Sequence, residues 1–192
     1  EPTESKKDYG KLFGGFESTS AYYLDDKTLG DFTFKDRFRS NNYLNLNYEY
    51  KNFSAGLQAE GYEPNALLNY NPKYKGTEIA TYYVAYKNKY IEATLGYFYE
   101  QFGSGLLLRT WEDRQLGINN SLRGARVVLK PTDDIIFKAL YGQQRSGFDV
   151  SEGKIFGFDA DVVGFDFYVG FHCSVDGCVL FGVCLPVVVE DC

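Results

Sequence analysis

The feature that most constrains this chain is an alternation of apolar and polar side chains with a period of two residues. Between residues 41 and 50, four apolar side chains alternate with asparagine and glutamate: Leu44, Leu46, Tyr48 and Tyr50. Successive side chains of a β-strand point to opposite faces, whereas a helix repeats every 3.6 residues. The pattern therefore predicts strands with one apolar and one polar face, at 14–24, 41–50, 53–60, 77–87, 90–100, 122–130, 135–144 and 156–162.

The composition agrees with an all-β chain and excludes several other classes. Aromatic residues, which favour strands, make up 18% of the 192 residues. This content argues against disorder, and no stretch is apolar for long enough to form a transmembrane helix. The net charge of −6 argues against a nucleic-acid partner, which requires a basic face. Methionine is absent, so we expect a processed amino terminus and an exported chain whose signal peptide has been removed.

The connections between the predicted strands also carry information. Short turns at 51–52, 88–89 and 131–134 alternate with long segments at 25–41, 63–76 and 102–121 and a less long one at 145–153. Transmembrane barrels have short periplasmic turns, long extracellular loops and aromatic girdles, and their strands need about 9–11 residues. We therefore predict an antiparallel up-and-down transmembrane β-barrel of about eight to ten strands, or the N-terminal part of a larger barrel. Tyrosine and phenylalanine near strand ends also occur as cross-strand pairs in any β protein.

Two stretches carry a more specific pattern. Residues 101–109 read QFGSGLLLR and residues 111–127 read WEDRQLGINNSLRGARV. Together with residues 42–56, they resemble an uncharacterised family of outer-membrane β-barrel proteins from Bacteroidota-type bacteria, over about residues 12–162. The resemblance implies the outer membrane of a Gram-negative cell, lipid as a partner, a barrel longer than this chain, and no known enzymatic activity. It supplies no functional residues.

A concentration of charge surrounds the longest predicted loop. It comprises four guanidinium groups and two carboxylates, from Arg109, Glu112, Asp113, Arg114, Arg123 and Arg126. These side chains could form an ion-paired constriction or plug inside a barrel, or ordinary surface pairs on an external loop. We favour inward pairing, because Arg123 and Arg126 lie at the start of a strand. Other charged side chains expected to point inward would also need partners; these are Glu49, Glu60, Glu92 and Lys138.

The C-terminal segment differs from the rest of the chain. We divide the sequence into an N-terminal extension (1–13), the strands (14–162) and an atypical tail (163–192), which holds all four cysteines and the only histidine. Because the tail ends without an aromatic strand signal, we expect a truncated or frameshifted terminus that is not a well-paired part of the barrel. The alternative is a last hairpin of 164–171 and 178–189, with Cys173 and Cys178 close enough to form a disulfide.

The sequence offers no recognisable catalytic machinery. A single histidine and the absence of a nucleophile elbow make a Ser-His-Asp hydrolase hard to assemble. The cysteine spacings match no common zinc pattern, so neither a metal nor a cofactor is expected. We therefore expect a non-enzymatic outer-membrane barrel with a structural, pore or envelope-scaffold role, in contact with lipid and with other envelope or secretion proteins. The alternative is a soluble lipocalin-like barrel whose apolar face surrounds a small hydrophobic ligand, since alternation is symmetric under exchange of the two faces.

Overall fold

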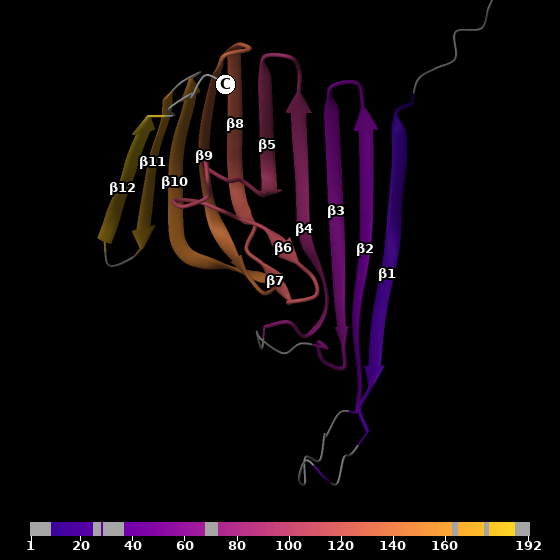
Figure 1. Ribbon diagram of the computed structural model, residues 1–192. Helices are drawn as coiled ribbons and strands as arrows, with labels where there is room; N and C mark the ends of the chain where they lie inside the picture. The colour runs from indigo at the N-terminus through magenta and orange to yellow at the C-terminus, as the bar shows by residue number, and fades with distance from the viewer. Residues whose placement is uncertain are drawn as a thin grey trace, which may run out of the picture.

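The computed structural model describes residues 9–24, 28, 37–67 and 73–162 with their side chains, and the backbone of 165–174 and 177–186. Its main element is one ten-stranded sheet in which neighbouring strands are antiparallel and follow each other in chain order (Figure 1). The strands are β1 (Lys11–Tyr22), β2 (Phe38–Tyr50), β3 (Phe53–Glu63), β4 (Gly76–Lys87), β5 (Ile91–Phe98), β8 (Leu122–Thr132), β9 (Ile135–Ser146), β10 (Asp149–Val162), β11 (Phe165–Ser174) and β12 (Gly177–Pro186). Two short strands, β6 (Glu112–Asp113) and β7 (Ile118–Asn119), form a separate hairpin.

The predicted all-β, antiparallel, up-and-down architecture is confirmed. The sheet does not close among the described strands, because β1 and β12 lie at its two opposite edges. No helix in the described part of the chain is both long and apolar enough to cross a membrane.

Two expectations about the strands are corrected. The loop predicted at 145–153 is a two-residue connection, since β9 ends at Ser146 and β10 begins at Asp149. Gly147 makes the tight turn possible with a φ of +70°, and a register shift between Val150 and Lys154 interrupts the alternation that would have revealed the strand.

The tail is the second correction. β11 pairs with β10 and β12 pairs with β11, so the backbone of 165–174 and 177–186 extends the sheet, as in the alternative of a last hairpin. Cys173 and Cys178 are direct partners in the register of this hairpin. The side chains of 163–192 lie outside the described residues, so the disulfide stays a prediction.

Cross-strand register gives the sheet two chemically different faces. One row of directly paired residues runs from β1 to β10 and is apolar throughout: Leu12, Tyr48, Ala55, Val84, Leu95, Ala125, Tyr141 and Phe156. Several side chains in this row are well exposed, at 72% for Leu12, 64% for Leu95 and 56% for Val84. We call this side the apolar face.

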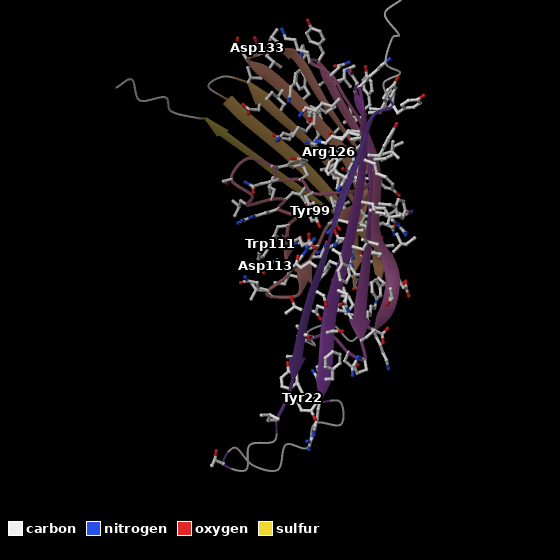
Figure 2. All side chains as sticks on the ribbon, turned by 90° about the vertical axis from the view of Figure 1, so that its right-hand side faces the viewer. Tyr22, Tyr99, Trp111, Asp113, Arg126 and Asp133 are labelled. Carbon is white, nitrogen blue, oxygen red and sulfur yellow. The ribbon has the colours of Figure 1, made fainter. Side chains whose placement is uncertain are left out.

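The opposite side, which we call the polar face, carries the buried charges and is covered by the segment 99–121. In the edge-on view of Figure 2, Trp111 and Asp113 of this segment lie to one side of the sheet. Most of the buried apolar side chains form two small clusters rather than a layer beneath the whole sheet. One cluster contains Phe98, Phe102, Leu122 and Leu140, and the other Tyr43, Tyr62, Ala66 and Tyr74.

Candidate functional site

The segment 99–121, which we call the covering loop, is the feature that most distinguishes the polar face. Its first half turns back on itself through an isolated bridge between Gln101 and Arg109 and a bond from the Phe102 amide to the Leu108 carbonyl. Its second half is the β6–β7 hairpin. Asp113 tightens that hairpin, since its Oδ1 accepts from the amides of Gln115 and Leu116 at 2.9 and 3.0 Å.

The first half of the covering loop is fixed by apolar packing. The Phe102 ring, 2% exposed, lies directly on Gly157 of β10 and packs with Leu140 of β9. A Cβ atom added at Gly157 would lie 2.6 Å from the ring of Phe102. Glycine at position 157 therefore provides the space in which the ring sits.

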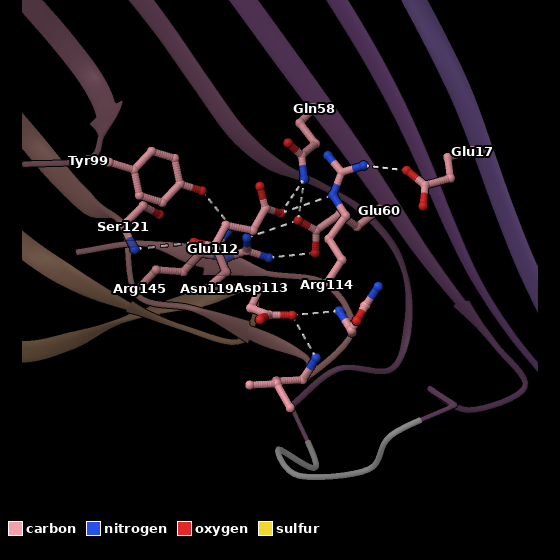
Figure 3. A network of polar contacts seen from close by, with 12 residues as sticks. Glu17, Gln58, Glu60, Tyr99, Glu112, Asp113, Arg114, Asn119, Ser121 and Arg145 are labelled. Atoms are coloured by element: carbon pink, nitrogen blue, oxygen red, sulfur yellow. Dashed lines mark hydrogen bonds and ion pairs between the residues drawn. The ribbon is translucent and has the colours of Figure 1, made fainter. Parts of the chain in front are cut away.

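The second half of the covering loop is fixed by polar and charged contacts to β1 and β3, on the same polar face. The Arg114 guanidinium donates to Glu17 of β1 at 2.7 Å and to Glu112 at 3.4 Å, and it lies 4.5 Å from the Tyr43 ring centroid (Figure 3). Gln58 of β3 donates to Glu112 at 3.3 Å. Burial alone would lower the pKa of Arg114, but the Glu112 and Glu17 carboxylates outweigh it and raise this pKa.

A fully buried ion pair lies beneath this hairpin. Arg145 of β9 donates to both carboxylate oxygens of Glu60 in β3, at 2.9 and 2.7 Å, and the two side chains are 0% and 2% exposed. Glu60 also accepts from Gln58 at 2.8 Å and from the Tyr62 hydroxyl at 2.7 Å. A bidentate pair with these additional donors is the arrangement that a buried carboxylate needs.

A second charged network lies on the polar face of β5, β8, β9 and β10. Arg126 contacts Glu100 and lies 3.8 Å from Glu92. Lys130 and Lys87 hold Glu92 at 2.8 and 3.1 Å. Lys138 bonds to Asp159 at 2.8 Å and lies 3.9 Å from Glu100.

The six residues singled out from the sequence fall into three groups. Glu112, Arg114 and Arg126 take part in the two networks. The Arg109 guanidinium lies 5.8 Å from the Trp111 ring centroid, and the Asp113 carboxylate accepts a hydrogen bond from the Gln115 amide in the turn of the hairpin. Arg123 is an exposed register partner of Tyr97, in the alternation of the apolar face. The expectation that Arg123 and Arg126 both point inward is therefore wrong, because a spacing of three places two strand residues on opposite faces.

Sequence reasoning missed the partners of the inward charges. Glu60, Glu92 and Lys138 were expected to need partners, but their partners Arg145, Lys130 and Asp159 were not identified. Strict alternation from Tyr141 would have placed Arg145 on the apolar face. The hairpin end of β9 and β10 bends toward β6 and β7 (Figure 1), and this bend brings Arg145 to Glu60.

Polar cavities flank the covering loop on both sides. One of about 490 Å³ separates the hairpin from β1 and β2 and is lined by Glu17, Thr19, Tyr23, Asn41, Tyr43, Leu67, Arg114 and Gln115. Another of about 360 Å³ lies over β3 to β5, between Gln58, Thr81, Tyr83, Thr94, Glu112 and Arg126 among others. Within the described ranges, no group of three His, Cys, Asp or Glu side chains could hold a metal ion. The arrangement is therefore a polar surface with paired charges and a loop fixed across it.

Comparison with known proteins identifies the family. A family of unknown function, DUF6029, matches residues 1–167, so the chain belongs to that family. No curated protein and no solved structure matches the chain significantly.

Proposed function

We propose that this DUF6029 chain forms wall strands of an outer-membrane β-barrel, with the apolar face in lipid and the polar face lining the lumen. The covering loop would then narrow a pore, or plug a barrel with a structural or scaffold role. The observation that carries the proposal is the continuous apolar row from β1 to β10, exposed at all positions but Ala55 and Ala125, opposite a face of ion pairs. Exposed apolar patches of this extent mark a contact surface.

Three further features support lipid as the partner of the apolar face. From β1 to β9, short turns gather at one end of the strands and the longer connections at the other, as in transmembrane barrels, whereas the β9–β10 and β11–β12 connections at the loop end have two residues each. The strands β1 to β4 and β8 to β10 have 11 to 14 residues, long enough to cross hydrocarbon when tilted. Exposed aromatic rings lie near both ends, including Tyr22, Phe38, Phe53 and Tyr90.

The two faces also discriminate against a lipocalin-like interior. Such a barrel would fill its lumen with the apolar row and turn the polar face to water. Here the covering loop and the fully buried Glu60–Arg145 pair occupy the polar face, while Val84 and Leu95 remain exposed. The polar face therefore has the burial expected of an interior.

Arginine substitutions on the two faces test the proposal. Leu95→Arg should reduce assembly into detergent micelles and bilayers by about 2–4 kcal/mol, because it places a charge in hydrocarbon. A soluble protein would tolerate the same change at a side chain that is 64% exposed. Asn45→Arg, on the polar face of β2, is the matched control and should assemble normally. The proposal fails if Leu95→Arg assembles as well as the control, or if carbonate without detergent releases the wild-type chain from membranes.

A further inference from the structure

Lysine side chains lie over aromatic rings at the short-turn end of β1 to β5. Lys51 in the β2–β3 turn has its Nζ 5.0 Å from the Tyr50 ring centroid, and Lys89 in the β4–β5 turn has its Nζ 5.5 Å from that of Tyr90. Lys11, at the start of β1, has its Nζ 5.4 Å from the ring of Phe13. We call Lys11, Lys51 and Lys89 the lysine rim.

The ammonium groups of the lysine rim are not neutralised within the described residues. None of the three forms an ion pair there, and all three side chains are exposed. Lys87 and Lys130 lie at the same end but are held by Glu92 at 3.1 and 2.8 Å. Lys51 and Lys89 therefore keep positive charges that no carboxylate pairs with among the described residues, whereas Lys11 lies directly opposite Glu49 in the register of β1 and β2.

At the loop end of the sheet, the positively charged side chains have different contacts from those of the lysine rim. There the cations over aromatic rings are guanidinium groups, and Arg114 and Arg145 are also committed to carboxylates. Charge is also distributed unevenly over the short-turn end, because the β8–β9 turn carries Asp133 and Asp134 instead of lysine. Figure 2 shows Asp133 at the end of the sheet opposite Tyr22. Among the described residues, the exposed lysines of the short-turn end that form no ion pair thus lie in the β1–β5 sector.

We propose that the lysine rim binds the phosphate groups of anionic phospholipids, with Lys51 and Lys89 as the main contacts. The inference rests on the proposed membrane location. A lysine can lay its methylene stem along an apolar surface and place its ammonium group at headgroup depth. The neighbouring rings of Tyr90 and Phe53, each 56% exposed, have the amphipathic or apolar character suited to that level. Phosphate is the anion that the headgroup region supplies there, and lysine binds it as a point charge.

Lipid retention measured by native mass spectrometry tests this assignment. The full chain is folded in detergent and titrated with short-chain phosphatidylglycerol or phosphatidylcholine, and the ratio of apparent dissociation constants is compared. Each lysine near an anionic headgroup contributes a factor of about five, so the double variant Lys51→Gln/Lys89→Gln should lose about 25-fold of the preference for phosphatidylglycerol. The control Lys75→Gln/Lys154→Gln removes two exposed lysines outside the rim and should change the preference less than twofold.

Three results would overturn the assignment. One is a wild-type chain that folds in micelles and bilayers without preferring phosphatidylglycerol, which leaves the membrane proposal intact and rejects the lysine rim alone. Another is an equal loss of preference in both double variants, which would indicate a general effect of net charge. A chain that enters neither micelles nor bilayers would reject both the rim and the proposed function.

Discussion

Removing one partner of the buried Glu60–Arg145 pair should be the most damaging single polar substitution in the sheet. Glu60→Gln leaves the Arg145 charge buried without a carboxylate, beside the neutral amide of the new side chain, the Gly147 carbonyl at 2.7 Å and the Tyr74 ring at 5.6 Å. Breaking a buried pair by removing one partner costs about 3–5 kcal/mol. Since both side chains are at most 2% exposed, solvent cannot screen the remaining charge, and we expect at least about 3 kcal/mol.

Urea unfolding of the chain in detergent micelles, followed by far-ultraviolet circular dichroism, measures this loss. Asp149→Asn is the control, because its contact with Lys73 is 3.9 Å long and exposed, and such surface pairs contribute about 0–1 kcal/mol. The double variant Glu60→Gln/Arg145→Met should be less destabilised than the sum of the single variants, since it leaves no buried charge unpaired. A loss below about 1 kcal/mol for Glu60→Gln, or strict additivity in the double variant, would refute the reasoning.

Two further predictions concern the covering loop. Gly157→Val should push the Phe102 ring from its seat and speed tryptic cleavage of the loop, whereas Gly15→Ala, which has no neighbour within 4 Å, should leave the cleavage rate unchanged. Burial raises the pKa of Tyr99 to about 12, so the folded state retains this proton more tightly than the unfolded state, whose tyrosine pKa is about 10. The stabilisation is complete below pH 10 and is lost as the pH rises toward 12, and the fluorescence of Trp111 should report a transition there that Tyr99→Phe removes.

The alternation of apolar and polar residues predicted most of the strands, because neighbouring residues of a strand lie in turn on the apolar face and on the polar face. The apolar positions from Leu44 to Tyr48 and from Ile91 to Leu95 lie on the apolar face. The pattern weakened where the geometry departs from a regular strand. The register shift after Val150 concealed the start of β10, so a tight turn was mistaken for a loop.

The composition of the tail does not predict its backbone pairing. Cysteines and a missing aromatic end signal suggested a foreign segment, yet the backbone of β11 and β12 forms a hairpin beside β10. The dipeptide Asp176-Gly177 is the sequence signal in favour of the hairpin.

The candidate site was less predictable than the sheet, because its partners are distant in sequence. Arg114 and Glu17 are 97 residues apart, and Arg145 and Glu60 are 85 apart. The need for partners at inward charges could be inferred from desolvation, but their identities depend on how the covering loop and the β9–β10 end bend over the polar face. A pattern of period two contains no information about such bends.

Spin-label accessibility along β5 tests the central claim most directly. With the four native cysteines replaced by serine, labels are placed singly at Ala93, Thr94 and Leu95 in the bilayer-incorporated chain. If the apolar face lies in lipid, oxygen should reach Ala93 and Leu95 more readily than a water-soluble nickel chelate does, and Thr94 should show the reverse. Equal access of the nickel chelate to Leu95 and Thr94 would contradict the account.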